Sequence, residues 1–245
     1  QGYSSAASDV YKRQVSVLSG VTTSLKGYAR IGVVGTSGSG KSTLLRLLAG
    51  LEDPAAGAFV LDGQEALMTL RYESWEEQVA YIPQDPTIFH ASLRENLTFY
   101  NPQASDDRLH AVIEKLGLSE LLAQLPQGLD TLIGEGARGL SGGQAQRIAL
   151  ARVVLDERKR IILFDEPTAH LDIETEMELK QAMVEVMQER LVVFATHRLH
   201  WLDTLDYLLV LEEGKLVEQG TTTQLLESTT HFATLVRALC GGEAA

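Results

Sequence analysis

Residues 35–42 have the composition and spacing of a phosphate-binding loop. The segment reads GTSGSGKS, a complete G-x-x-x-x-G-K-S, between an apolar stretch and an amphipathic one that begins at Lys41. Glycines let successive backbone N–H groups face the α- and β-phosphates, while Lys41 reaches the β- and γ-phosphates and the Ser42 hydroxyl binds Mg²⁺. The positive end of the following helix favours the same anion. We therefore expect a nucleoside triphosphate to be bound by Gly35, Thr36, Ser37, Gly38, Ser39, Gly40, Lys41, Ser42 and Thr43.

Two adjacent carboxylates, Asp165 and Glu166, follow a second apolar run at 161–164. Asp165 is placed where phosphate-loop enzymes carry a carboxylate that helps to hold Mg²⁺. Glu166 has the chemistry of a general base that polarises the attacking water. The segment LSGGQ at 140–144 precedes a helical pattern, so its N–H groups and the Ser141 hydroxyl could bind an anion. A solvated turn is the alternative for the carboxylates, and an ordinary turn is the alternative for LSGGQ.

The elements that must position these residues alternate along the chain. Strands are predicted at 29–34, 79–83, 161–164 and 191–195, a short strand that closes on a turn at 59–63, and a hairpin across 207–218. Helical spacing is found at 41–49, over most of 92–125, and at 174–190. Strands that alternate with helices predict an α/β fold with a mainly parallel sheet and right-handed crossovers.

Composition narrows the class of protein. The chain has 245 residues, 44% of them apolar, and no apolar run approaches the roughly 18 residues of a membrane helix. Its net charge of −12 disfavours a nucleic-acid partner. The single cysteine, Cys240, excludes an intrachain disulfide and fits a reducing compartment. Residues 1–14 lack an initiating Met and the apolar core of a signal peptide, so we expect a non-native segment or a flexible lead-in there.

Together, these motifs resemble the nucleotide-binding domain of ATP-binding cassette (ABC) proteins over residues 15–240. The resemblance implies a P-loop NTPase (RecA-like) core with an antiparallel β edge, and a helical signature subdomain inserted at about 87–158. It also identifies a Q-loop glutamine, Gln84, a D-loop at 169–172 that ends in Asp172, and a switch histidine, His197. The family's LSGGQ signature corresponds to Leu140, Ser141, Gly142, Gly143 and Gln144.

The resemblance implies a mechanism that needs a second subunit. Two such domains pack head to tail, so that Ser141 and Gly143 of one domain would contact the ATP bound by the other. Within one domain, Glu166, His197 and Gln84 would be the catalytic residues. Mg²⁺ would be held by Ser42, Gln84 and Asp165. An aromatic residue usually precedes the loop to stack on adenine, and the aromatic nearest to that position is Tyr11.

Other segments resemble the exporter branch of the family. The Q-loop is followed by an apolar pair and R-E-N within 84–97. The segment 132–136 resembles the exporter loop whose glutamate, here Glu135, contacts the membrane domain, and a solvated loop acid is the alternative. This resemblance implies a transmembrane partner domain and a location at the cytoplasmic face of a bacterial inner (plasma) membrane. Two departures, A-Q-R after the signature and His170 in the D-loop, resemble a subfamily that exports cysteine and glutathione.

Two other functions are compatible with a cassette of this kind. One is a soluble ABC ATPase that acts on nucleic acid or ribosomes, but such proteins carry tandem cassettes or long coiled coils. The other is a non-hydrolysing regulatory ATP module. The presence of Glu166, His197 and a complete signature favours hydrolysis over the second alternative.

Overall fold

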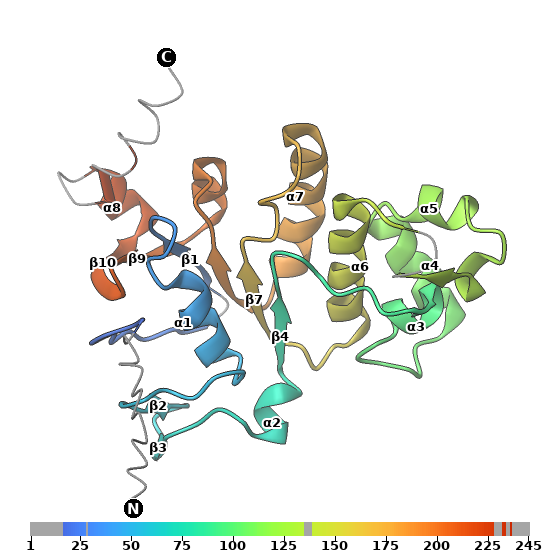
Figure 1. The fold of residues 1–245 in the computed structure, drawn as a ribbon. Helices are drawn as coiled ribbons and strands as arrows, with labels where there is room; N and C mark the ends of the chain where they lie inside the picture. The colour runs from blue at the N-terminus through green and yellow to red at the C-terminus, as the bar shows by residue number, and fades with distance from the viewer. Residues whose placement is uncertain (1–16, 28, 135–138, 228–231, 234–235, 237–245) are drawn as a thin grey trace, which may run out of the picture.

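A six-stranded sheet forms the centre of the fold (Figure 1). The computed structural model describes residues 17–27, 29–134, 139–227, 232–233 and 236. The strands, in spatial order, are β10 (Lys215–Thr221), β9 (Tyr207–Glu212), β1 (Arg30–Val34), β8 (Leu191–Ala195), β7 (Ile161–Asp165) and β4 (Val79–Ile82). Neighbours from β9 to β4 pair in parallel, and β10 pairs with β9 antiparallel. The predicted α/β fold with a mainly parallel sheet is confirmed.

The strand sequences explain this arrangement. The strands β7 and β8 read IILFD and LVVFA and are almost completely buried, as expected for parallel strands covered on both faces. The edge strand β10 reads KLVEQGT and alternates exposed and half-buried residues over most of its length. The antiparallel edge therefore belongs to the part of the sheet with the more polar sequence.

Helices and short strands complete the described fold. The helices are α1 (Lys41–Leu48), α2 (Glu73–Glu76), α3 (Leu93–Leu97), α4 (Asp106–Lys115), α5 (Ser119–Ala123), α6 (Gly142–Leu155), α7 (Ile173–Met187) and α8 (Thr222–Glu227), with 3-10 turns η1 (Gly128–Asp130) and η2 (Leu199–Thr204). Two further two-stranded sheets are formed by β2 (Phe59–Val60) with β3 (Ala66–Leu67), and by β5 (Ala91–Ser92) with β6 (Leu132–Ile133). Within the described ranges, no helix combines the length and apolar character needed to cross a bilayer.

The structure defines the ends of two predicted elements. The strand predicted to close on a turn within 59–63 is two residues long, and Asp62 and Gly63, which both have positive φ angles, form that turn. The helix predicted to reach Arg190 ends at Met187, and Glu189 has a φ of 57°. The strand therefore stops at the turn, and the helix stops because Gln188 leaves the helical region with a ψ of 140°.

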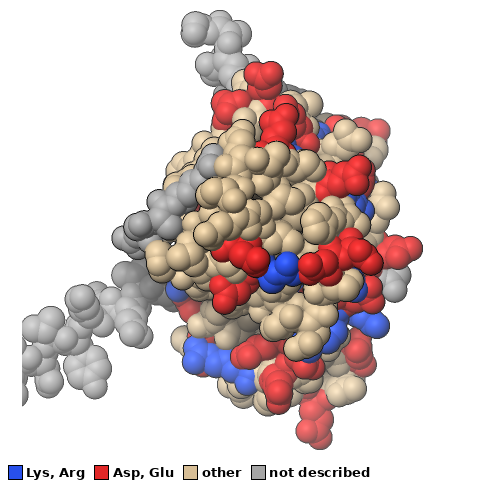
Figure 2. All heavy atoms as spheres, turned by 90° about the vertical axis from the view of Figure 1, so that its right-hand side faces the viewer, with Lys and Arg blue, Asp and Glu red and all other residues tan. Residues whose placement is uncertain are grey.

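The elements α3 to α6 gather on one side of the molecule (Figure 1). Three of them, α3 to α5, lie in the stretch 92–125 that is predicted to be mostly helical. On the face that these helices present, acidic side chains are interspersed with fewer basic ones (Figure 2). The acidic balance of the composition is therefore visible on this face.

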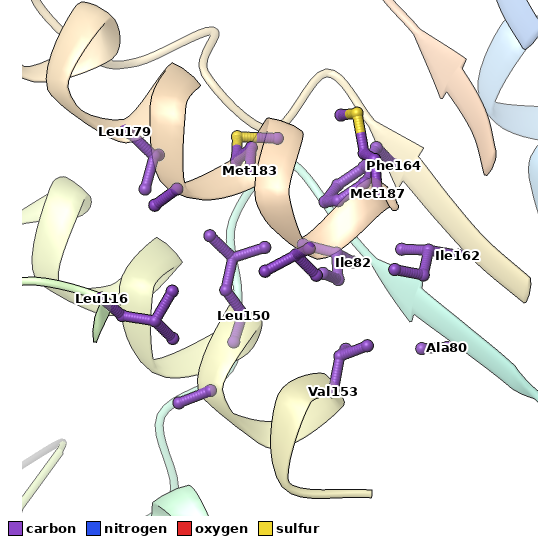
Figure 3. Packing of buried hydrophobic residues seen from close by; sticks show 14 of the residues in the cluster. Ala80, Ile82, Leu116, Leu150, Val153, Ile162, Phe164, Leu179, Met183 and Met187 are labelled. Carbon is purple, nitrogen blue, oxygen red and sulfur yellow. The ribbon is translucent and has the colours of Figure 1, made fainter. Parts of the chain in front are cut away.

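A buried apolar cluster joins this helical side to the sheet. Leu150 of α6 points towards Ile82 of β4 and towards Met183 of α7 (Figure 3). These three side chains are 1%, 2% and 1% exposed. Helix α6, which begins within the LSGGQ segment, is therefore held by packing against β4, the strand that precedes Gln84.

Replacing Leu150 by alanine is expected to lower the free energy of unfolding by about 2–5 kcal/mol, because the change leaves a cavity in this cluster. Urea unfolding followed by circular dichroism measures the loss. Met68, which is 63% exposed, provides the matched control, and Met68→Ala should leave the midpoint nearly unchanged. A Leu150→Ala variant as stable as the control would contradict the described packing of α6.

Candidate functional site

The predicted chemical residues meet at one edge of the sheet. Residues 35–40 follow β1, Gln84 follows β4, Glu166 follows β7 and His197 follows β8. Since these four strands are parallel, the loops after them leave the sheet at the same, carboxyl edge. Open α/β sheets bind ligands at this edge.

The loop at 35–40 needs glycine at two positions in particular. A Cβ on Gly35 would lie 2.2 Å from the backbone oxygen of Leu211. Gly40 has a φ of 101° and precedes α1, where no side chain caps the helix. The first backbone N–H groups of α1 are therefore free of a side-chain cap, as an anion-binding helix N-terminus requires.

Lys41, Glu166 and His197 form one contact cluster. The Lys41 ammonium is 4% exposed, donates to the backbone oxygens of Gly35 and Thr36 at 2.9 and 3.2 Å, and lies 3.2 Å from Glu166 Oε1. The other carboxylate oxygen of Glu166 lies 3.0 Å from His197 Nδ1. Glu166 has a φ of 48°, a strained conformation of the kind found at functional sites. Three residues predicted from separate motifs are thus brought together.

Ser42 and Asp165 form the second part of the site. The Ser42 hydroxyl donates to Asp165 Oδ1 at 2.8 Å, and the Tyr81 hydroxyl donates to Oδ2 at 2.8 Å. Burial raises the pKa of Tyr81, and its bond to Asp165 raises it further, so the phenol stays a hydrogen-bond donor at neutral pH. A hydroxyl beside a carboxylate is an oxygen donor pair that suits Mg²⁺.

The phosphate loop also holds an unsatisfied polar atom. The Ser39 Oγ is buried and has no hydrogen-bond partner among the described residues. Leaving such a group unmatched costs free energy, so its persistence calls for an explanation. A phosphate oxygen in the loop would supply the missing partner. The loop and the Ser42–Asp165 pair therefore fit a Mg²⁺–nucleotide ligand.

Gln84, the third predicted Mg²⁺ ligand, contacts other residues in the structure. Its side-chain amide is 2.7 Å from Nε2 of His170, and its backbone oxygen accepts from Gln146 Nε2 at 2.8 Å. The structure therefore joins Ser42 to Asp165 but pairs Gln84 with the D-loop.

A cavity of about 340 Å³ opens between the phosphate loop and the switch histidine. Its lining combines the polar groups described above with an apolar wall. The lining residues are Val34, Gly35, Thr36, Ser37, Lys41, Glu166, Thr196, His197, Arg198, Leu199, Leu202 and Phe232. Of the predicted loop residues, Gly35 to Ser37 and Lys41 line it, while Gly38, Ser39, Gly40, Ser42 and Thr43 lie along the loop and the start of α1.

The predicted signature residues lie away from this cavity. Among the described residues that line it, none comes from 140–144. Ser141 is exposed and caps α6: its hydroxyl accepts from the Gln144 N–H at 3.2 Å, and the Gln144 side chain accepts from the Ser141 N–H at 3.0 Å. A Cβ on Gly143 would lie 2.7 Å from Thr175 Cγ2, so the helix start packs closely against α7. One chain therefore presents the loop and the signature at separate places.

Asp172 has a structural contact of its own. Its carboxylate caps α7 by accepting from the N–H and the hydroxyl of Thr175, at 2.9 and 2.8 Å. These bonds lower the pKa of Asp172. The end of the D-loop is therefore fixed to the first turn of α7.

Several expectations lie outside the described residues. They concern Tyr11 as the adenine platform, the lead-in at 1–14, Glu135 and Cys240.

Sequence reasoning missed three residues of the site. Tyr81 lies within a predicted strand, and its position beside the strand that ends at Asp165 was the available signal. His170 appeared only as a departure in the D-loop, and its partner Gln84 lies 86 residues away. Glu176 lies in the helix predicted at 174–190, and it is 1% exposed. A buried charge of this kind is not visible from helical spacing alone.

Comparison with known proteins agrees with this geometry. The family model for ABC transporters matches residues 18–169. The chain therefore belongs to the ABC transporter family. Its predicted fold class and its prediction as an ABC ATPase are confirmed at the level of the family.

The similar proteins are exporters or transporters. The chain is 46% identical over 227 residues to the glutathione/L-cysteine transport system ATP-binding/permease protein CydC of Bacillus subtilis, covering 93% of this chain and 40% of the relative. It is 39% identical over 210 residues to human mitochondrial iron-sulfur clusters transporter ABCB7, covering 86% and 28%. The solved structure of a bacterial Atm1-family ABC exporter with ATP bound matches with a TM-score of 0.82 at 34% identity, covering 96% and 40%.

The chain thus spans 40% or less of the length of each of these proteins. All three are described as transport proteins, and none as an ATPase that acts on nucleic acid or ribosomes.

Proposed function

We propose that this chain hydrolyses ATP as one half of a head-to-tail pair of nucleotide-binding domains and thereby powers an exporter. The observation that carries the proposal is the separation of two half-sites within one chain. The cluster of Lys41, Glu166 and His197 lies in one cavity, and the Ser141 end of α6 lies elsewhere. Each half-site would be completed by the other subunit.

The chain's own residues supply most of the chemistry of hydrolysis. The loop N–H groups and the Lys41 ammonium would offset the negative charge of the transferred phosphoryl group. Glu166 would accept the proton of the attacking water as general base. His197 would hydrogen bond the γ-phosphate and keep the Glu166 carboxylate oriented, which its 3.0 Å contact supports.

Mg²⁺ would be held by Ser42, Asp165 and Gln84. When bound, it neutralises phosphate charge and orients the phosphate oxygens. Tyr81 would orient the Asp165 carboxylate towards the metal through its hydrogen bond. Gln84 would have to exchange its bond with His170 for the metal.

The proposed domain spans residues 15–240, with a helical subdomain at about 87–158 that contains α3 to α6. Tyr11 would stack on adenine, and residues 140–144 and Asp172 would face the partner subunit. A transmembrane domain would be the second partner, and the ATPase would then lie at the cytoplasmic face of a bacterial inner membrane. Cysteine and glutathione are the proposed cargo, supported by the CydC relative.

ATP hydrolysis by the chain is expected to rise more steeply than linearly with protein concentration, because each site forms only in a dimer. Phosphate release, measured over a wide range of chain concentrations with excess Mg²⁺ and ATP, tests this. Chelation of Mg²⁺ by EDTA should stop the reaction. A rate strictly proportional to concentration down to the most dilute samples would argue for a monomeric site.

A further inference from the structure

The side chain of Glu176 lies buried at a junction between three segments. It is part of α7 and is 1% exposed. Its Oε1 accepts from the Thr168 hydroxyl at 2.5 Å and from Trp201 Nε1 at 2.9 Å, and it lies 3.0 Å from His200 Nε2. Its Oε2 pairs with the Arg198 guanidinium. One carboxylate therefore contacts the segment after β7 and the segment after β8.

The Arg198 guanidinium extends this junction to the D-loop backbone. Its Nη2 donates to the backbone oxygens of Ala169 and Leu171, at 3.1 and 3.3 Å. Arg198 is also the immediate neighbour of His197 and lines the same cavity. The D-loop and the switch-histidine segment are thus tied to one buried ion pair.

The buried Glu176 carboxylate is compensated by the groups around it. Burial alone would raise the pKa of Glu176, but the hydrogen bonds from Thr168 and Trp201 and the charges of His200 and Arg198 outweigh burial, so the pKa is lowered. Glu176 is therefore ionised at neutral pH. A buried ion pair persists only where its polar groups are satisfied, and losing one partner leaves a costly uncompensated charge.

A second residue of α7 holds the same segment. Lys180 donates to Asp203 Oδ1 at 2.8 Å and to the backbone oxygen of His200, and its ammonium lies 5.4 Å from the centre of the Trp201 ring. Glu176 and Lys180 are one helical turn apart, so they face the same side of α7. The switch-histidine segment therefore rests on one face of this helix.

We propose that Glu176 is a positioning residue that holds the D-loop and the segment 197–201 as one unit and so sets His197 against Glu166. The proposal rests on the proposed function, because it assigns a task within that ATPase site. It also explains how the partner subunit could influence catalysis. A partner residue that contacts the D-loop would affect the position of His197, because Arg198 and Glu176 connect the two segments.

The first test replaces Glu176 by glutamine, which keeps the shape but removes the charge that faces Arg198. The turnover number of the chain for ATP is expected to fall by about tenfold to a hundredfold, as for a misplaced catalytic group. The KM for ATP should stay within about twofold, because Lys41 and the phosphate loop are unchanged. Glu185→Gln is the matched control on the same helix, since the Glu185 side chain is exposed and pairs with Lys115 at the surface.

A double-mutant cycle separates positioning from a merely structural role. In a His197→Ala background, Glu176→Gln is expected to lower the single-turnover rate by less than about twofold, because the group it positions has been removed. An equal loss with and without His197 would overturn the proposal, as would an unchanged turnover number. Arg198→Lys keeps the positive charge but loses the forked contact with Ala169 and Leu171, and it provides a second variant if Glu176→Gln does not fold.

The outcome for the unmodified chain distinguishes this inference from the proposed function. If the unmodified chain binds ATP but does not hydrolyse it under any condition, both fail. If it hydrolyses ATP and the double-mutant cycle is additive, only the positioning role of Glu176 fails.

Discussion

Replacing Glu166 by glutamine is expected to lower the turnover number for ATP by about 10²–10⁴-fold, the usual contribution of a general base. Glutamine preserves the size of the side chain but cannot accept the proton of the attacking water. ATP binding should be retained or become tighter, because the variant removes the negative charge 3.2 Å from the Lys41 ammonium. Phosphate release and titration with a fluorescent ATP analogue measure the two effects separately.

Glu166→Gln should also accumulate as an ATP-bound dimer, because ATP hydrolysis is needed for the two subunits to separate. Size-exclusion chromatography with and without ATP detects this shift. Glu213→Gln is the matched control, since Glu213 has nearly the same φ, 47° against 48°, but is exposed in the β9–β10 turn. If Glu166→Gln keeps full ATPase activity, Glu166 is not the base.

The sheet and its functional edge could be predicted because strong local signals mark them. The run at 161–164 is fully apolar and ends in two carboxylates, so it predicts both a buried strand and a site at its end. The loop at 35–42 carries its own flanking strand and helix. Since parallel strands end at the same edge, the meeting of Lys41 with Glu166 follows from the topology.

The contacts that reach across the fold could not be predicted in the same way. Gln84 and His170 are both polar residues of exposed loops, and nothing in their local sequence indicates that their side chains meet. The burial of Glu176 depends on Trp201 and Arg198, which lie more than twenty residues further along the chain. Such pairs are decided by tertiary packing, which helical and strand periodicity do not report.

The separation of the two half-sites is the basis for a dimeric ATPase. Lys41 lies in the cavity that contains Glu166, whereas Ser141 lies at the exposed start of α6. A head-to-tail dimer with twofold symmetry would bring each loop against the other subunit's signature and create two equivalent sites. In a homodimer, loss of Lys41 should then inactivate both sites through their own loops, and loss of Ser141 should inactivate both through the signature of the opposite subunit.

We expect Lys41→Ala and Ser141→Arg each to lose nearly all ATPase activity when assayed alone. The first removes the buried cation that faces the phosphates, and the second places a bulky side chain at the partner-facing end of α6. Ser141 also caps this helix, so Ser141→Arg is expected to cost about 1 kcal/mol of stability, which thermal unfolding of the variant will measure.

Mixing these two inactive variants tests the composite site most directly. In a mixed dimer, one site combines the intact Lys41 of one subunit with the intact Ser141 of the other. Random pairing of equal amounts should therefore restore about a quarter of the unmodified activity, because half of the dimers are mixed and each has one intact site. A mixture of Lys41→Ala with the double variant Lys41→Ala/Ser141→Arg serves as the control and should stay inactive. Recovery only in the first mixture is the predicted result, and the absence of recovery from two folded, dimerising variants would contradict the account.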